Sequence, residues 1–305
     1  MMPEWHGVSY HGALTVVGTD LKDQAGRDVI LRGMSSHGMQ WYPHFARRES
    51  INITKQAGAN VFRIAMYTDE GGYLSDHRVE QDVVRAVNAT LALDMYAIID
   101  WHINYDNNPM EHVDEAAIFF DRMSRHYKDA PGVIYEICNE PNGQDVTWAN
   151  SVKPYAERII PVIRKQSPKA LILVGSSTWS QDVDICAADP LDFDNLMYTL
   201  HFYAGTHGEE LRSKCLTALG MGAPIFASEW GTSAADGNGG VYIKESNEWL
   251  AFLAQHRLSW CNWSLADRNE TSAALLPGAP ISWSQKHLSQ SGRFVFERLK
   301  DYLPD

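Results

Sequence analysis

Eight short apolar runs, rich in β-branched and aromatic residues, recur along the chain and are separated by longer stretches with helical periodicity. This alternation is typical of repeated βα units around a parallel sheet. Because eight such strands can close on themselves, the pattern favours an α/β fold of the (β/α)8 type, a TIM barrel, over an open sheet. The expected strands cover residues 29–34, 60–66, 96–101, 133–138, 171–175, 196–202, 224–230 and 259–265.

Four of the intervening stretches predict helices, at residues 77–94, 114–129, 153–167 and 243–257. Apolar residues spaced four apart in the first stretch would lie on one face against the sheet. Residues 10–28, which contain "DQAGRD" between two apolar runs, predict a β-hairpin that caps the bottom of the barrel. We find no linker, low-complexity tract or repeat, and therefore expect one domain over residues 1–305.

Composition narrows the class of partner. The formal net charge of −12 argues against nucleic acid, which needs clustered Lys and Arg. No segment approaches the ~20 continuous apolar residues of a membrane span, so we expect no membrane partner. The cysteines, with no C-x-x-C pair, are expected to be free thiols, with one disulfide as the alternative: Cys138, Cys186, Cys215 and Cys261.

Polar and aromatic residues collect where the expected strands end, which is where barrels of this kind carry their chemistry. Two of them, Glu140 in "NEP" and Glu229 in "SEWG", each follow a buried strand directly. One such Glu is more often a solvated loop residue, but a pair can divide the cleavage of a glycosidic bond between a proton donor and a nucleophile. A carboxyl separation of about 5–5.5 Å would indicate retention of configuration, and about 6.5–9.5 Å inversion.

The histidines His37, His102 and His201 raise a zinc alternative, because imidazoles on barrel strands bind metal in some hydrolases. Such sites usually bring two histidines one residue apart on the first strand, whereas the local sequence is "SSHGM". Hydrogen bonding to a polyol is the favoured interpretation, and a buried histidine satisfied by backbone is the alternative for each. We therefore expect no metal and no cofactor.

Ten tryptophans in 305 residues support a sugar ligand. Four of them fall in loops or at strand ends, where an exposed indole is costly unless a ligand covers it: Trp41, Trp179, Trp230 and Trp263. Arg63 would be a buried cation that holds Glu229 in its ionised form, or a purely structural ion pair. Glu136 lies four residues before Glu140, hence on the same strand face but deeper, and is expected to pair with Arg63 rather than act directly.

Several motifs together resemble the catalytic domains of glycoside hydrolase family 5 endoglucanases, in their bacterial cellulase branch. The resemblance runs from Leu31 to Leu275 and is carried by "LRGMSSHGMQWY", "VFRIAMYT", "IIDWH", "VIYEICNEPNG", "VGSSTWSQDV", "HFYAGTHG", "FASEWGTS" and "NWSLADRNETSAAL". It implies a retaining endo-β-1,4-glucanase with Glu140 as general acid/base and Glu229 as nucleophile. It further implies that Asn139 binds the sugar 2-hydroxyl and that Tyr203 and Arg63 hold Glu229.

The resemblance also assigns the remaining sugar-binding residues. The cleavage subsite would be lined by Arg63, His102, His201 and Tyr203; the non-reducing side by His37, Trp41, Tyr67 and Trp263. Trp179 would be a stacking platform on the leaving-group side. Arg268 stands where many relatives carry lysine, so hydroxyl contacts there are expected to differ, whereas Glu270 fits the pattern.

The resemblance implies a β-1,4-glucan as the partner, and leaves open the family's mannanase, licheninase and xylanase activities. A metal-dependent hydrolase and an inactive sugar-binding barrel are the alternatives from other classes. Family members act outside the cell, yet the stretch "MMPEWHGVSYHG" lacks the features of a secretory signal. We therefore expect a trimmed mature domain of a secreted protein, monomeric, with a carbohydrate-binding module elsewhere in the full-length chain.

Overall fold

Eight parallel strands form a closed barrel, which confirms the predicted (β/α)8 fold. The computed structural model describes residues 6–301, so residues 1–5 and 302–305 of the predicted domain lie outside it. The barrel closes where the last strand pairs with the first. Its strands are β3 (Arg32–Ser36), β4 (Val61–Tyr67), β5 (Tyr96–His102), β6 (Val133–Glu136), β7 (Ile172–Val174), β8 (Leu196–Tyr203), β9 (Ile225–Gly231) and β10 (Ser259–Leu265).

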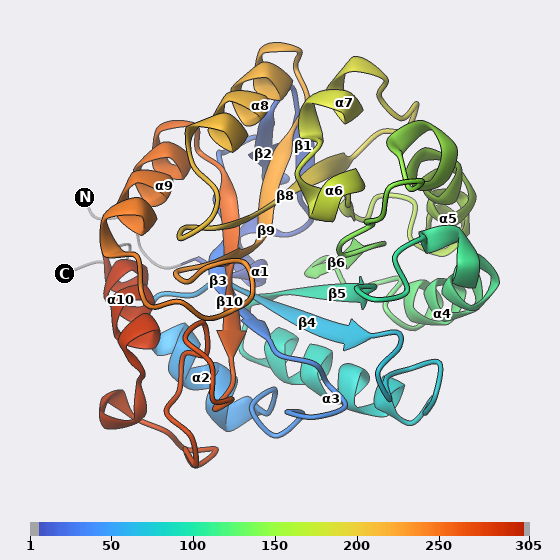
Figure 1. The fold of residues 1–305 in the computed structure, drawn as a ribbon. Coiled ribbons are helices and arrows are strands. Elements are labelled where there is room, and N and C mark those ends of the chain that lie inside the picture. Colours follow the sequence, from blue (N-terminus) through green and yellow to red (C-terminus); the bar gives the residue numbers. More distant parts are fainter. Residues whose placement is uncertain (1–5, 302–305) are drawn as a thin grey trace.

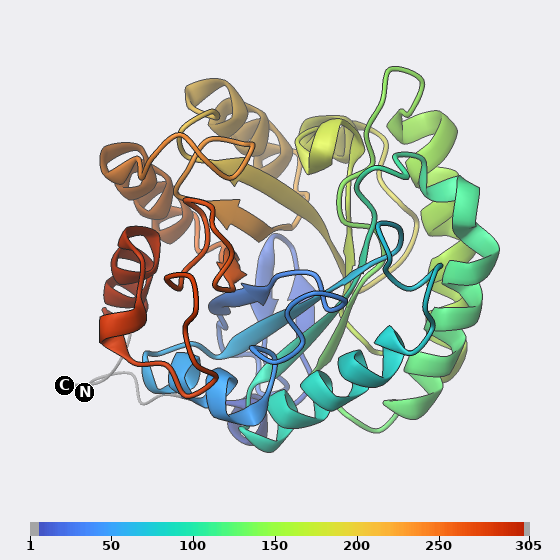
Figure 2. The ribbon, with the colours of Figure 1, turned by 60° about the horizontal axis from the view of Figure 1, so that its bottom comes forward.

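Helices surround the strands in both ribbon views (Figures 1 and 2). The four predicted helices are confirmed as α3 (Val79–Ala92), α4 (Val113–His126), α5 (Lys153–Gln166) and α9 (Ile243–Gln255). Others complete the ring, namely α2 (Arg48–Gln56), α7 (Val183–Ala188), α8 (Glu209–Gly220) and α10 (Gln290–Lys300). Single turns are α1 (Val8–His11), η1 (Pro109–His112), η2 (Trp148–Val152), α6 (Ser177–Ser180) and η3 (Gln285–His287). Within residues 6–301, every helix is too short or too polar to cross a membrane.

An N-terminal hairpin caps the bottom of the barrel, as predicted, but it is shorter than residues 10–28. Its strands β1 (Thr15–Val17) and β2 (Asp20–Lys22) pair around Gly18, whose φ of 62° suits a tight turn. The segment "DQAGRD", predicted as the turn, instead follows β2 and is closed by a bridge between Lys22 and Asp28. Leu14 and Leu21 pack in one cluster with residues at the starts of the barrel strands.

Strand alternation divides the core into two layers and fixes which side chains reach the barrel interior. Along β4, Phe62, Ile64 and Met66 pack into the large cluster between barrel and helices, whereas Arg63 points inward. The same alternation makes the prediction for Trp230 wrong. Trp230 follows an inward residue, so it faces outward, where it is fully buried among aromatic side chains and does not line the cleft. The four cysteines are also buried and unpaired.

Candidate active site

A cleft of about 600 Å³ opens at the carboxyl ends of the barrel strands. Of the predicted site residues, all but Arg63 and Asn139 line it: His37, Trp41, Tyr67, His102, Glu140, Trp179, His201, Tyr203, Glu229, Trp263, Arg268 and Glu270. The strands therefore bring together residues that lie up to 233 positions apart in the sequence, counted from His37 to Glu270 (270 − 37). This is the convergence that the parallel topology predicted.

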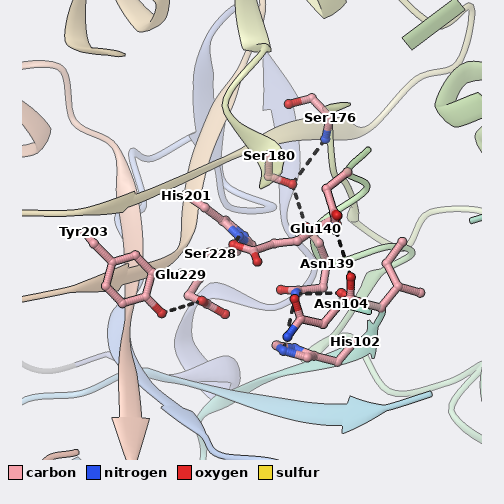
Figure 3. Close-up of polar contacts among 12 residues, drawn as sticks. His102, Asn104, Asn139, Glu140, Ser176, Ser180, His201, Tyr203, Ser228 and Glu229 are labelled. Carbon is pink, nitrogen blue, oxygen red and sulfur yellow. Dashed lines mark hydrogen bonds and ion pairs between the residues drawn. The ribbon is translucent and has the colours of Figure 1, made fainter. Parts of the chain in front are cut away.

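Glu229 on β9 is 4% exposed and has both carboxylate oxygens engaged. Arg63 donates from Nη1 to its Oε2 at 2.9 Å. Tyr203 donates its hydroxyl to Oε1 at 2.8 Å, as Figure 3 shows. Two donors from different strands therefore fix the carboxylate plane. The expected contacts of Arg63 and Tyr203 with Glu229 are confirmed.

Arg63 is the centre of a buried charge cluster beneath the cleft. It donates to Glu136 from Nε at 2.7 Å and from Nη2 at 3.1 Å, and Nη2 lies 3.0 Å from Asp100. Burial by itself would raise the pKa of Glu136, but Arg63 and His201 outweigh it and lower that pKa to about 2. For Asp100, burial dominates over the attraction of Arg63 and raises the pKa. Glu136 is thus the buried partner of Arg63 that the sequence predicted.

His201 on β8 connects this cluster to Glu140. Its Nδ1 lies 3.0 Å from Oε1 of Glu140, and its Nε2 lies 2.8 Å from the hydroxyl of Ser228. Ser228 in turn donates to Glu136 at 2.7 Å. Figure 3 shows His201 between Glu140 and Ser228. Burial would lower the pKa of His201, yet its interactions with Glu136 and Glu140 prevail and raise it to about 9. His201 is therefore a cation at neutral pH, and it contacts Glu140 from the barrel side.

Asn139 lies outside the lining of the cleft because it is fully buried below His102. Its Oδ1 accepts from Arg63 at 2.6 Å, and its Nδ2 donates to the carbonyl of Ile103 at 3.0 Å. A longer contact of 3.3 Å joins Nδ2 to His102 Nε2. Asn139 therefore serves the internal hydrogen-bond network in this state, and one of its amide hydrogens has only a weak partner.

Aromatic rings form one wall of the cleft. The ring of His102 stacks on Tyr67 at 4.2 Å between centroids and on Trp263 at 5.2 Å. His37 lies 4.9 Å from Trp263, and Trp41 lies 5.1 Å from Tyr67. Burial lowers the pKa of both histidines to about 3, helped by Arg268 for His37 and by Arg63 for His102. Both are neutral rings, suited to hydrogen bonding and stacking rather than to charge pairing.

Three exposed side chains line the cleft, namely Trp41, Trp179 and Arg268. Trp179, on the turn α6 after β7, has 46% of its surface exposed. Arg268 extends over His37, with Nη1 3.1 Å from His37 Nε2, and its Nε pairs with Glu270 at 2.9 Å. Trp41, at 39% exposed, is the other open indole of the cleft.

The structure adds lining residues that the sequence pattern did not indicate. They come from the loops above the strands: Glu70, Asn104, Tyr105, Thr178, Gln181, His207, Ala235, Asp236 and Gly237. The path of these loops follows no sequence period, so strand alternation could not assign them. A weak signal existed at residues 232–242, whose Gly and Asn content marks a loop next to the strand that carries Glu229.

The three histidines of the zinc alternative do not form one site. Within residues 6–301, one set of three potential metal-ligating side chains comes close together, namely Glu140, His201 and Glu229. One ligating atom from each lies within 4.8 Å of the others. Instead, His102 stacks on Trp263, and His37 packs against the same ring at a tilt. A carboxylate oxygen of Glu140 therefore lies within 4.8 Å of a carboxylate oxygen of Glu229.

Comparisons with known proteins agree with this geometry. The family model "Cellulase (glycosyl hydrolase family 5)" matches residues 22–269. Endoglucanase A of Evansella cellulosilytica is 52% identical over 279 residues, which cover 90% of this chain and 57% of that protein. The chain thus spans little more than half the length of this relative.

Two solved structures extend the likeness to three dimensions. Cellulase Cel5C_n superposes with a TM-score of 0.93 and 45% identity, covering 98% of this chain and 95% of that one. The catalytic domain of the Thermobifida fusca endoglucanase Cel5A, solved with cellotetraose, superposes with a TM-score of 0.91 and 33% identity, covering 96% and 98%. With the family model matched across the barrel and the carboxylate pair at its mouth, the chain belongs to glycosyl hydrolase family 5.

Proposed function

We propose that this chain is an endo-β-1,4-glucanase that hydrolyses internal bonds of cellulose and related β-glucans with retention of configuration. The observation that carries the proposal is the pair of carboxylates, Glu140 and Glu229, with oxygens within 4.8 Å at the floor of an open cleft. The nearest oxygens of the pair lie closer than the about 6.5–9.5 Å between the carboxyl groups of inverting enzymes, which supports a nucleophile and an acid acting with retention.

In the first step, Glu229 attacks the anomeric carbon while Glu140 gives its proton to the departing glycosidic oxygen. A C–O bond to Glu229 forms as the bond to the leaving sugar breaks. In the second step, Glu140 removes a proton from water, which attacks the same carbon and releases Glu229. The donors from Arg63 and Tyr203 keep Glu229 aimed at the carbon in both steps.

His201 supports the double role of Glu140. Its Nδ1 lies 3.0 Å from Glu140 Oε1, so an imidazolium there donates to the carboxylate whenever Glu140 has lost its proton. That interaction stabilises the glycosyl-enzyme formed in the first step, in which Glu140 is a carboxylate ready to act as a base. Asn139 is assigned to the sugar 2-hydroxyl, which would replace the weak 3.3 Å contact of its Nδ2 with His102.

The aromatic wall is assigned to the non-reducing side of the cut and Trp179 to the leaving-group side. Flat rings stack on the C–H faces of pyranoses, so the aromatic wall and the exposed indole offer stacking surfaces for sugars on both sides of the cut. An open groove suits cleavage inside a polymer. Arg268 and Glu270, joined at 2.9 Å, offer hydroxyl contacts beyond the wall.

Support for glucan as substrate comes from the relatives, which are named endoglucanase or cellulase, and from the cellotetraose bound to the Thermobifida fusca catalytic domain. We also propose that this chain is the monomeric catalytic part of a secreted, longer protein that carries a carbohydrate-binding module. Mannanase, licheninase and xylanase activities are the alternatives. Glucan and mannan differ only in an equatorial or axial 2-hydroxyl, which is a small change for such a groove.

A reducing-sugar assay on carboxymethylcellulose, lichenan and galactomannan tests the function. We expect the highest initial rate on a β-glucan and loss of turnover in Glu229→Gln, because the amide cannot attack. Glu115→Gln, an exposed carboxyl on α4, is the matched control and should keep wild-type rates. A marked preference for galactomannan would overturn the substrate assignment, and turnover by Glu229→Gln would overturn the mechanism.

A further inference from the structure

The turn α6 has a backbone conformation that ordinary side chains avoid. Thr178, Trp179 and Ser180 all have positive φ angles, of 54°, 55° and 56°. None of them is glycine, so each places its Cβ close to the following carbonyl. Such strain persists only where surrounding contacts hold it, and it is concentrated at sites where a side chain must point in one direction. Here the middle residue is Trp179, which lines the cleft.

One carboxylate holds the turn from below. Asp182 accepts at Oδ2 from the hydroxyls of Ser177 at 2.7 Å and Thr178 at 2.6 Å. Lys214, which extends from α8, donates to Oδ1 at 2.8 Å. Burial would raise the pKa of Asp182, but the bonds from Lys214, Thr178 and Ser177 prevail and lower it. Asp182 is therefore an ionised hub, a carboxylate that accepts hydrogen bonds both from the strained turn α6 and from Lys214 on α8.

The turn is also bonded directly to the segment that carries Glu140. Trp179 donates its backbone N–H to the carbonyl of Pro141 at 3.0 Å, and Ser180 donates its hydroxyl to the carbonyl of Asn139 at 2.6 Å. These two carbonyls lie immediately before and after Glu140 in the chain. Figure 3 shows Ser180 directed at this backbone. The turn that carries the indole is therefore hydrogen-bonded to the backbone on both sides of Glu140.

We propose that Asp182, anchored by Lys214, is a positioning residue that sets the height and angle of the Trp179 ring relative to Glu140, and so determines how strongly the leaving-group sugar binds in the transition state. The inference rests on the proposed function and extends it to residues outside the cleft. Its physical basis is that a strained turn without its hub relaxes to an ordinary conformation, which carries the indole away.

Two substrates distinguish the positioning of Trp179 by Asp182 from a general loss of activity. Cellopentaose places sugar on both sides of the cut, whereas β-cellobiosyl fluoride loses a single fluoride ion and leaves the Trp179 side empty. In Asp182→Ala we expect the ratio of kcat/KM for cellopentaose to kcat/KM for the fluoride to fall about tenfold, the scale of one lost stacking contact. Thr178→Val removes the hydrogen bond from Thr178 to Asp182 and should lower the ratio less than Asp182→Ala does. It provides the test if Asp182→Ala does not fold.

A double-mutant cycle tests whether Asp182 acts through Trp179. Trp179→Ala should lower the same ratio, and adding Asp182→Ala to it should change nothing further. Asp184→Asn is the matched control, because one oxygen of this nearby carboxylate has no hydrogen-bond partner and the residue lies outside the turn. Its ratio should stay at the wild-type value.

The outcomes are distinct. An unchanged ratio in Asp182→Ala, an equal loss on both substrates, or additive effects of the two substitutions would overturn the inference while leaving the proposed function intact. If the wild-type protein hydrolysed neither substrate, the proposed function would fail and this inference with it.

Discussion

Arg63 Nη1 lies 2.9 Å from Glu229 Oε2, and the same guanidinium is bonded through Nε, at 2.7 Å, to Glu136. One buried cation thus fixes an acid at the cleft floor and a second acid in the barrel core. Because a guanidinium presents several donors in a rigid fork, it can serve both carboxylates at once. The orientation of Glu229 therefore depends on the integrity of the buried cluster.

Removing the cation should cost both stability and activity. In Arg63→Met, Glu136 and Glu229 lose their buried counter-ion, and we expect the free energy of unfolding to drop by about 3–5 kcal/mol. Chemical denaturation measures this directly. Arg78→Ala, which removes an exposed pair with Asp76, should leave the denaturation midpoint within error. A midpoint for Arg63→Met equal to that of the wild type would contradict the account of the cluster.

Tyr203→Phe removes a single donor from Glu229 Oε1 without opening a cavity. A hydrogen bond to a charged group that holds the nucleophile should be worth about 10- to 100-fold in kcat/KM. Kinetics on a soluble β-glucan give the value. The control Tyr127→Phe loses a hydroxyl that contacts Asn88 in the helical layer, and should keep wild-type kinetics. If Tyr203→Phe had the same kcat/KM as Tyr127→Phe, the hydroxyl of Tyr203 would have no role in catalysis.

His201 should make the stability of the protein depend on pH in the alkaline range. Its pKa is about 9 when folded, against an ordinary value of 6.5, so the folded state holds the proton more tightly. The stabilisation is fully present below pH 6.5 and declines as pH rises through about 9. Thermal unfolding at a series of pH values tests it.

The slope of melting temperature against pH between about 7 and 9.5 should be shallower in His201→Gln than in the wild type, because glutamine does not titrate. His126→Gln, at an exposed position on α4, should keep the wild-type slope. Identical slopes in the wild type and His201→Gln would mean that His201 does not carry this proton.

Metal removal should have no effect on turnover. Glu140, His201 and Glu229 could together hold a divalent ion, but the proposed mechanism needs these groups free for proton transfer and attack. We expect enzyme dialysed against EDTA to retain its full rate on carboxymethylcellulose. Loss of activity that Zn²⁺ or Mn²⁺ restores would favour the metal-dependent alternative instead.

The barrel and its carboxylate pair were predictable because both follow from regular periods. Parallel strands place their carboxyl ends at one rim, so Glu140 and Glu229 had to converge once their strands were recognised. The two-residue period also placed Glu136 beneath Glu140, where Arg63 contacts it. Applied to Trp230, the same period would have assigned it to the outer layer, since it directly follows Glu229.

Other features had no readable signal. The sequence "STWS" of α6 contains no glycine, so nothing in it indicates three left-handed residues. The partnership of Asp182 with Lys214 joins two elements that only the folded barrel brings together. Asn139 was expected in the cleft, and its burial below His102 depends on how the loops after β5 and β6 pack.

The central claim is that Glu229 forms a covalent bond to the sugar, and trapping that bond tests it most directly. With 2-deoxy-2-fluoro-β-cellobiosyl fluoride, fluoride leaves as the bond to Glu229 forms, and the 2-fluoro group slows its hydrolysis by destabilising the oxocarbenium-like transition state. The account predicts one added glycosyl mass on the intact protein, mapped by peptide mass spectrometry to Glu229. A label on any other residue, or normal glucan hydrolysis with no adduct formed, would contradict it.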